Sequence, residues 1–247
     1  MATVALCVQG CSFSPLTNRI KVGEEAFVVF VAEGIDNNTD LFVSLAAGGV
    51  VTQLTYTAAV ERTPRMSPEG GVLAFIRERD AGDPRPTVVA MNLLNGAERS
   101  YVLPANAGTP RSLGWSREVG QLHVQTERGT WTVPTLERDP AILPVAENKR
   151  VAADSAFEIW LGEPRFARAV MCANALCVIG PSGNATALAP SGSGALRWGS
   201  DSVAWFENQS LVVRALGPGP ARRVTWRRAP DNPRDATYGR GRAWKNE

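Results

Sequence analysis

The stretch TPRMSPEGGVLAFIRER, residues 63–79, joins a tight turn directly to a strand. Residues 67–71 form a cluster of turn-forming residues. Val72, Ala74 and Ile76 then place apolar side chains on one face of the segment that follows, because alternate side chains of a strand share a face. The stretch therefore predicts a β-strand that is entered from a tight turn.

The turn also ends a short preceding strand. Pro64 fits the start of that strand, where its missing N–H is tolerated, and Gly70 and Gly71 supply the positive φ that the turn needs. Two looser copies follow, TPRSLGWSREVG at residues 109–120 and GALRWGSDS at residues 194–202. A strand–turn–strand unit that recurs along the chain predicts a repeat architecture.

The whole chain carries the same pattern of short apolar strands. The first apolar strands of successive copies begin near Phe27, Val72, Leu122, Val170 and Val203, at intervals of 45, 50, 48 and 33 residues. Such intervals are typical of the four-stranded blades of a β-propeller, in which sheets that cannot bury both faces alone are stacked around an axis. We therefore predict an all-β fold, a β-propeller of five or six four-stranded blades.

Closure of the ring is expected to involve the ends of the chain, because an open ring leaves unpaired strand edges. The segment DATYGRGRAW, residues 235–244, is the candidate, paired with an N-terminal segment such as NRIKVG, residues 18–23. Trp115 and Trp198 hold equivalent places in two copies of the unit. We expect them to pack between blades, and an aromatic ring around a ligand-binding mouth is the alternative.

The composition supports a folded β domain with a basic end. The 247 residues are 44% hydrophobic and 20% charged, which allows a substantial core. No apolar run of about 18 residues, the length needed to cross a membrane, occurs in the sequence. Residues 222–247 carry eight basic and three acidic side chains. A basic tail can bind phosphate-rich partners, but a solvated terminal segment is the simpler interpretation, and we expect no nucleic acid partner.

The motifs of residues 25–104 resemble the repeats of TolB-like periplasmic propeller proteins, which are relatives of the WD-type repeats. The family pattern is matched by Gln53-Leu54-Thr55 at a blade end, by residues 64–70 (Pro-Arg-Met-Ser-Pro-Glu-Gly), by Leu73-Ala74-Phe75 and by Gly48-Gly49. The match is partial over residues 110–135, and beyond residue 150 only the strand periodicity remains. The resemblance implies a propeller and a role in protein–protein contact in the bacterial cell envelope.

The N-terminus predicts export. In MATVALCVQGCSFSP, an apolar run and a small residue precede Cys11, as at the end of a lipoprotein signal peptide, although the basic n-region and most of the apolar stretch are missing. Cys11 is the candidate for lipidation, and an ordinary N-terminus with a buried cysteine is the alternative. We therefore expect a signal-like segment over residues 1–17, a propeller over 18–235, and a basic C-terminal tail over 236–247 that takes part in ring closure.

Cys172 and Cys177 form the other cysteine pair of interest. In a hairpin with Asn174-Ala175 at its tip, Cys172 lies opposite Cys177, close enough for a disulfide in an oxidising compartment. Two reduced, packed thiols are the alternative. We expect no metal site, because a zinc site needs more ligands and the chain has one histidine, His123.

Catalytic constellations are sparse. His123 is the only candidate base for a Ser-His-Asp hydrolase, and it lies in an alternating strand segment that favours a surface or blade-interface position. The Gly- and Ser-rich segment at residues 180–194 lacks the lysine of a phosphate loop, and GIDNNTD lacks the spacing of a calcium loop. The acids that a glycosidase-type mechanism would draw on lie mainly in turns: Asp36, Asp40, Glu69, Asp80, Asp83 and Asp201.

Two functions from different classes remain. The favoured one is a non-catalytic, TolB-like propeller without cofactor that binds a protein or peptide partner, with the loops at 79–87 and 136–150 as contact candidates. It would be periplasmic or anchored to the outer membrane, touching a membrane only through a lipid on Cys11, or cytoplasmic if the N-terminus is not a signal. The alternative is a propeller hydrolase or lyase acting on a saccharide or peptide. The sequence leaves the oligomeric state open.

Overall fold

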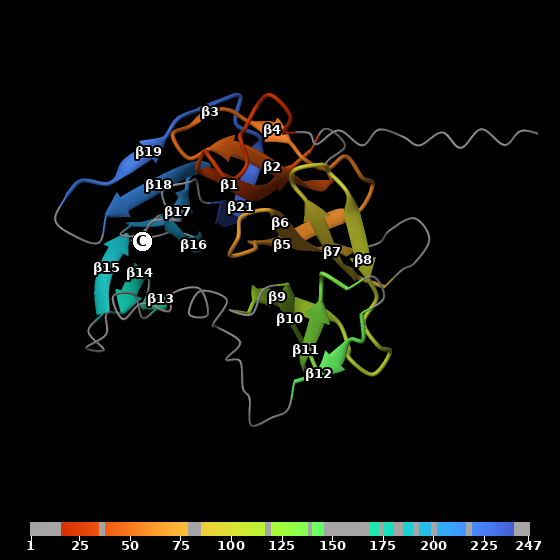
Figure 1. Cartoon of the computed structure of the whole chain (residues 1–247). Helices are drawn as coiled ribbons and strands as arrows, with labels where there is room; N and C mark the ends of the chain where they lie inside the picture. The colour runs from red at the N-terminus through yellow and green to blue at the C-terminus, as the bar shows by residue number, and fades with distance from the viewer. Residues whose placement is uncertain are drawn as a thin grey trace, which may run out of the picture.

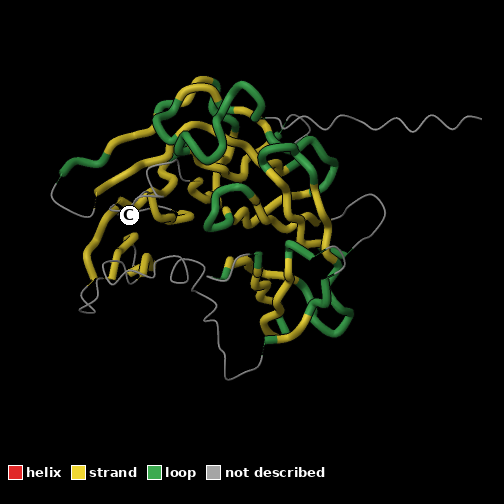
Figure 2. The backbone as a smooth tube through the Cα atoms, in the orientation of Figure 1, coloured by secondary structure: helices red, strands yellow, loops and turns green. Residues whose placement is uncertain are grey.

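The computed structural model describes residues 16–34, 38–78, 85–116, 120–137, 140–145, 168–172, 175–179, 185–189, 193–198, 202–215 and 219–239. The described residues form strands, turns and loops, and no helix occurs among them (Figure 2). The strands make up five radial sheets arranged around a common axis (Figure 1). The prediction of an all-β propeller is confirmed, and the described blades number five.

The sheets follow one another along the chain, and each is built outward from the axis. From the axis outward, blade 1 consists of β21 (Asp231–Gly239), β1 (Phe27–Glu33), β2 (Thr39–Leu45) and β4 (Thr52–Gln53), and blade 2 consists of β5 (Val60–Met66), β6 (Val72–Glu78), β7 (Thr87–Asn92) and β8 (Glu98–Tyr101). Blade 3 consists of β9 (Pro110–Trp115), β10 (Gln121–Thr126), β11 (Gly129–Pro134) and β12 (Leu143–Pro144), and blade 4 consists of β13 (Arg168–Cys172), β14 (Ala175–Ile179) and β15 (Ala185–Ala189). Blade 5 consists of β16 (Ser193–Trp198), β17 (Ser202–Glu207), β18 (Ser210–Ala215) and β19 (Arg222–Val224). A short parallel pair, β3 (Gly49–Val50) with β20 (Trp226–Arg227), joins the chain after blade 5 to blade 1.

The C-terminal strand closes the ring. β21 pairs antiparallel with β1, from Phe27 opposite Gly239 to Glu33 opposite Asp231, and becomes the innermost strand of blade 1. The prediction that residues 18–23 would pair with this closing strand was wrong. These residues contain turns and no strand, and Ile20 packs into the core instead. The expected domain boundary after residue 235 falls inside β21, so the propeller extends to Gly239.

The opening turn has the predicted role. The amide of Ser67 donates to the carbonyl of Val72 at 2.8 Å, and the amide of Gly70 donates back to Ser67 at 2.9 Å. Gly70 has φ of 75°, the conformation that glycine adopts without cost. Pro64 lies at a bulge inside β5 rather than at its start, which the innermost, edge position of the strand allows.

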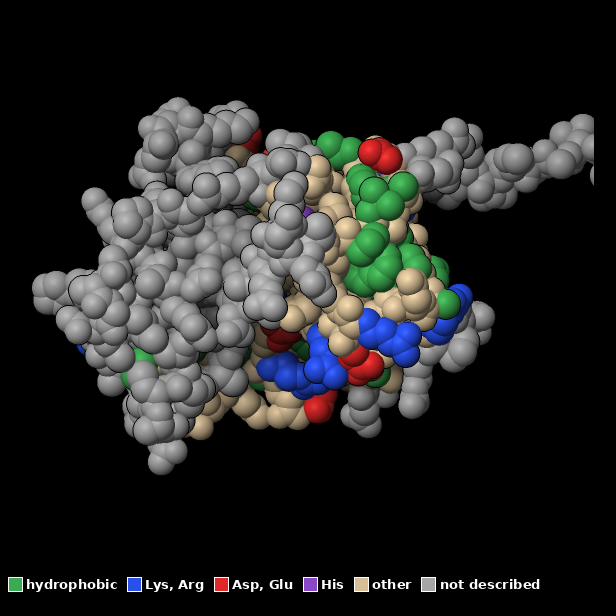
Figure 3. All heavy atoms as spheres, turned by 90° about the horizontal axis from the view of Figure 1, so that it is seen from below, with side chains coloured by type: hydrophobic (Ala, Val, Ile, Leu, Met, Phe, Trp, Pro, Cys, Tyr) green, Lys and Arg blue, Asp and Glu red, His purple; other side chains and the backbone are tan. Residues whose placement is uncertain are grey.

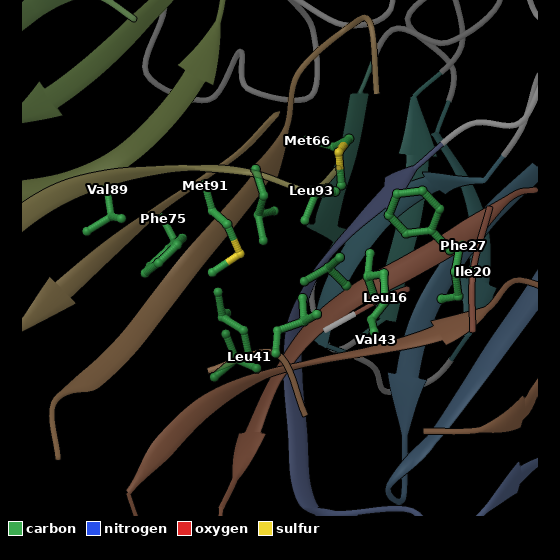
Figure 4. Packing of buried hydrophobic residues seen from close by; sticks show 14 residues of the cluster. Leu16, Ile20, Phe27, Leu41, Val43, Met66, Phe75, Val89, Met91 and Leu93 are labelled. Carbon is green, nitrogen blue, oxygen red and sulfur yellow. The ribbon is translucent and has the colours of Figure 1, made fainter. Parts of the chain in front are cut away.

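The core lies between blades, because each sheet buries both faces. On β1, Phe27, Val29 and Val31 face the core between blades 1 and 2, while Val28 and Phe30 face the core between blades 1 and 5. Figure 4 shows the first of these cores, with side chains of the two sheets meeting between the ribbons. Alternation along a strand therefore supplies two apolar faces, as radial stacking requires.

The repeated tryptophans pack between blades, as predicted. Trp115 is 2% exposed and Trp198 is 6% exposed. The indole of Trp115 donates to the backbone carbonyl of Arg65 on blade 2 at 2.9 Å. The ring centroids of Trp198 and of Tyr238 on β21 lie 4.9 Å apart. Both side chains therefore connect neighbouring innermost strands.

Candidate functional site

The innermost strands β5, β9, β16 and β21 lie side by side around the axis (Figure 1). Each of these four strands is irregular, because its register with the next strand of the blade shifts once or more. On β5 the shift includes Thr63 with φ of 57°, and on β21 it includes Asp235 with φ of 42°. Bulges re-aim the side chains beside them and are frequent near binding sites.

Three innermost strands carry the same dipeptide. Pro64-Arg65 lies on β5, Pro110-Arg111 on β9 and Pro233-Arg234 on β21, and all three prolines are buried. A proline lacks the N–H that a ladder needs, so it fits an irregular edge strand. We call Arg65, Arg111 and Arg234 the axial arginines.

A fourth arginine, Arg62, connects the innermost strands β5 and β9. Arg62 on β5 pairs through Nε with Glu78 at 2.6 Å. Its two terminal nitrogens donate to the carbonyls of Pro110 at 2.7 Å and Arg111 at 3.3 Å on blade 3. All three nitrogens of the Arg62 guanidinium therefore have partners, one in blade 2 and two in blade 3. These contacts hold blade 2 against blade 3.

Arg65 makes a corresponding contact with blade 1. Its Nη1 lies 3.1 Å from Oδ1 of Asp235 and 2.7 Å from the carbonyl of Pro64. Both side chains are partly exposed, at 23% for Arg65 and 35% for Asp235. Nearby, the amide of Met66 donates to Oγ1 of Thr237 at 2.9 Å. The strands are therefore held together independently of the Arg65 side chain.

The other two axial arginines are exposed. Arg111 pairs through Nη2 with Glu127 at 3.0 Å. Arg234 donates to Oγ1 of Thr39 at 3.0 Å and to the carbonyl of Asn232 at 3.4 Å. Seen from below the view of Figure 1, basic and acidic side chains lie next to one another along one edge of the molecule (Figure 3). We call the surface of the innermost strands β5, β9, β16 and β21 the axial surface, and Arg111 and Arg234 are exposed on it.

A buried ionic network connects three strands of blade 2. Arg77 of β6 reaches Glu61 of β5 at 2.7 Å and Glu98 of β8 at 2.6 Å. Arg77 also lies 5.2 Å from the centroid of the Phe75 ring. The Arg77 side chain is 6% exposed and that of Glu61 is fully buried. Oε2 of Glu61 is buried without a hydrogen-bond partner among the described residues.

Burial decides the protonation equilibria of this network. Desolvation raises the pKa of Glu61 above its usual range, although the hydrogen bond with Thr55 and the charge of Arg77 act in the opposite direction. Burial alone would lower the pKa of Arg77, but its hydrogen bonds and charge interactions with Glu98 and Glu61 raise it instead. Arg77 therefore stays charged between two carboxylates.

The acids proposed for the glycosidase-type mechanism do not form an accessible pair in the described structure. Asp40 is 4% exposed and accepts hydrogen bonds from Gln53 at 2.9 Å and Thr55 at 3.3 Å. The negative charge of Asp40 also contributes to raising the pKa of Glu61. Both carboxylates are buried and accept hydrogen bonds from neighbouring side chains. Glu69 lies in the opening turn, while Asp36, Asp80, Asp83 and Asp201 lie outside the described residues.

The cysteine predictions remain predictions. Cys11 lies outside the described residues. The hairpin of blade 4 places Cys172 opposite Ala175 and Cys177 opposite Val170, so the two cysteines are not directly opposed as expected. Cys177 is 3% exposed and is disulfide-bonded. The side chain of Cys172 lies outside the described part of the structure.

His123 has a structural environment. It lies on β10, half-buried, with Nδ1 3.1 Å from Oγ1 of Thr132 on β11. Among the described residues, no group of three His, Cys, Asp or Glu side chains is arranged to hold a metal ion. The same part of the chain contains no helix long and apolar enough to cross a membrane. Most of the contact loop at 79–87 and much of that at 136–150 lie outside the described residues.

Sequence reasoning missed the axial arginines and the Glu61–Arg77 pair. The Pro-Arg dipeptide stands in the opening unit, in its copy at residues 109–120 and again at residues 233–234, but it also occurs at residues 84–85 and 164–165, so it does not by itself mark the axial arginines. No comparable signal announces the Glu61–Arg77 pair, because the two residues lie 16 positions apart in a chain with many acids and arginines.

Comparison with known proteins gives structural neighbours only. No protein-family model matches the chain, and no curated protein matches its sequence. The chain is similar to TolB from Acinetobacter baumannii, with 10% identity, 91% of this chain and 69% of that chain covered, and a TM-score of 0.48. It is similar to a chain of a nidogen/laminin complex, with 10% identity, 87% and 98% covered, and a TM-score of 0.47. It is also similar to the β-propeller domain of the Trilobed protease from Pyrococcus furiosus, with 15% identity, 81% of each chain covered, and a TM-score of 0.39. The structural neighbours thus include TolB and other β-propeller proteins.

Proposed function

We propose that the chain is a non-catalytic, TolB-like propeller that binds a protein or peptide partner in the bacterial cell envelope. The observation that carries this proposal is the set of axial arginines, which stand on tightly connected innermost strands and keep guanidinium donors available. Binding requires a rigid, polar and accessible surface and no reactive group. The motif resemblance over residues 25–104 to TolB-like repeats supports the envelope setting.

The available donors follow from the contacts above. Every hydrogen bond of Arg65 in the described structure involves Nη1, so Nε and Nη2 can donate to a ligand. Toward the described residues, the Arg111 side chain donates only through Nη2. Arg234 donates to a hydroxyl and a carbonyl and pairs with no carboxylate among the described residues. Paired edges of a guanidinium recognise carboxylate-like acceptors with defined geometry.

Export and lipidation of Cys11 belong to the same proposal. A lipid on Cys11 would hold the propeller at a membrane surface, and an oxidising compartment would suit the disulfide of Cys177. Mass spectrometry of protein from the membrane fraction tests this part. An unmodified Cys11 in protein recovered from the cytoplasm would contradict it.

Site-specific crosslinking tests the binding function. A photoreactive amino acid at Asp231, exposed at the start of β21, is expected to crosslink a discrete protein in envelope extracts of the source bacterium. The same group at Ser100, exposed on β8 at the outer edge of blade 2, is the matched control and is expected to crosslink little. Equal products at both positions, or none at either, would contradict binding at the axial surface.

A further inference from the structure

The outer edge of blade 5 and the segment that follows it carry a run of arginines. Residues 211–230 contain five arginines and no acidic residue. Four of the five are exposed and lie within seven residues, on β19, on β20 and directly after it: Arg222, Arg223, Arg227 and Arg228. We call these four the edge arginines. The five charges exceed the formal net charge of +2 of the whole chain, so the rest of the chain is net acidic.

The edge arginines keep an excess of positive charge. Arg223 pairs with Glu207 of β17, and the other three pair with no carboxylate among the described residues. Arg222 lies over the face of the Trp198 ring, 5.9 Å from its centroid, a contact that leaves the charge of the guanidinium in place. The next acid along the chain, Asp231, lies on the innermost strand β21.

Protection of a strand edge accounts for only part of this set. Charged side chains on an outermost strand prevent another chain from pairing with it, and Arg222 and Arg223 on β19 serve that purpose. Arg227 lies on β20, which has two residues and is therefore too short to need such protection. Arg228 follows it at φ of 55°. These two charges add to the surface without protecting an edge.

The edge arginines lie on the same rim of the molecule as the start of the described chain. Arg227 pairs with Val50 of β3, and Thr52 of β4 accepts a hydrogen bond from Nη1 of Arg19 at 3.0 Å. β19, β3 and β4 follow one another along the upper rim in Figure 1. Cys11 precedes Arg19 by eight residues, which an extended chain spans in at most about 29 Å. A lipid on Cys11 would therefore be tethered close to the edge arginines.

We propose that the edge arginines bind the anionic headgroups of a membrane surface and hold the propeller with the outer edge of blade 5 toward the membrane. This inference rests on the proposed envelope setting and adds a second membrane contact to the lipid on Cys11. A polybasic patch strengthens anchoring by a lipid chain, because each arginine near an anionic surface contributes about fivefold to binding. Guanidinium groups also form paired hydrogen bonds with phosphate oxygens.

A membrane fits this edge better than a nucleic acid does. Single-stranded nucleic acids need exposed aromatic rings on which their bases stack. Trp226, which lies between the arginines, is partly buried and stacks on Phe30 with ring centroids 4.5 Å apart. Val50, opposite Arg227, is 61% exposed. An apolar side chain among cations suits the boundary between lipid headgroups and acyl chains.

Vesicle sedimentation with the purified full chain tests the inference. Every sample carries Cys11→Ser, so that no attached lipid contributes to binding. The vesicles contain equal amounts of phosphatidylglycerol and phosphatidylcholine, in about 0.1 M salt, where the screening length is about 10 Å. We expect binding to these vesicles and none to vesicles of phosphatidylcholine alone. We expect the double variant Arg227→Gln, Arg228→Gln to bind about 25-fold more weakly, because two contributions of about fivefold are lost.

The matched control is the double variant Arg99→Gln, Arg128→Gln. Both arginines are exposed, one on β8 of blade 2 and the other in the turn after β10 of blade 3. The control therefore loses the same charge away from the edge of blade 5, and we expect it to bind the anionic vesicles as tightly as the unchanged chain. Thermal unfolding of both double variants verifies that the propeller remains folded.

Four results would overturn the inference: no binding to the anionic vesicles, equal binding to the neutral ones, equal weakening in the two double variants, or displacement of the chain from the vesicles by duplex DNA at equal phosphate concentration. Failure of the proposed function is distinguishable. A partner crosslinked at Asp231 without vesicle binding would retain the proposed function and remove the membrane contact. Vesicle binding with an unmodified Cys11 in cells would retain the edge site and remove the lipid anchor.

Discussion

Replacement of Arg77 by methionine tests whether the buried ionic network stabilises blade 2. Methionine keeps most of the length of the side chain and removes its charge and its donors. Glu61 would then lie fully buried without a cation, and Glu98 would lose contacts at 2.6 and 3.1 Å. Removing one partner of a buried pair destabilises proteins by about 3–5 kcal/mol, because the remaining charge stays desolvated.

That magnitude is large against the stability of a whole domain, which is about 5–15 kcal/mol. Loss of the contact between Arg77 and the Phe75 ring adds to it, by about 0.5–1 kcal/mol or more. Arg223→Met is the matched control, because Arg223 is 54% exposed in its pair with Glu207. Exposed pairs contribute about 0–1 kcal/mol.

Urea unfolding followed by tryptophan fluorescence measures both variants, with the free-energy change taken from the midpoint at unchanged slope. The cost of Arg77→Met should fall as the pH is lowered from neutral, since burial has raised the pKa of Glu61 and a protonated Glu61 needs no cation. The double variant Glu61→Gln, Arg77→Met should be more stable than Arg77→Met alone. A cost of about 1 kcal/mol or less for Arg77→Met, no greater than that of Arg223→Met, would refute the reasoning.

Three further variants probe the same fold. Because the folded-state pKa of Glu61 is raised above its ordinary value of 4.5, its ionised form costs stability at neutral pH. The stability of wild type relative to Glu61→Gln should therefore grow as the pH falls through this raised pKa toward 4.5, and a pH-independent difference in urea midpoints would argue against it. Gly239→Ala should lower the melting temperature, since its Cβ would lie 2.3 Å from the buried ring of Phe27, and overpacking costs about 1–3 kcal/mol; an unchanged melting temperature would show that the ring yields. Thr237→Val should cost about 1–3 kcal/mol in urea unfolding, because the buried amide of Met66 loses its acceptor. A neutral result there would mean that another acceptor replaces the hydroxyl.

The sequence by itself determined the kind of fold. Residues 63–79 encode an innermost strand, a turn with Gly70 at positive φ, and an alternating strand that buries both faces. Turn chemistry and a two-residue period are local properties, so they can be recognised without knowing what each face contacts. The places of Trp115 and Trp198 followed from the same repeat.

The tertiary structure alone decided how the ring closes and where its charges meet. Arg65 and Asp235 lie 170 positions apart, and Met66 and Thr237 lie 171 positions apart. The sequence pattern suggested a C-terminal closing segment and the wrong partner, because nothing local distinguishes residues 18–23 from β1 as the strand that receives it. Pairing between distant strands depends on packing of the whole ring, and only the closed ring places the three Pro-Arg segments on innermost strands.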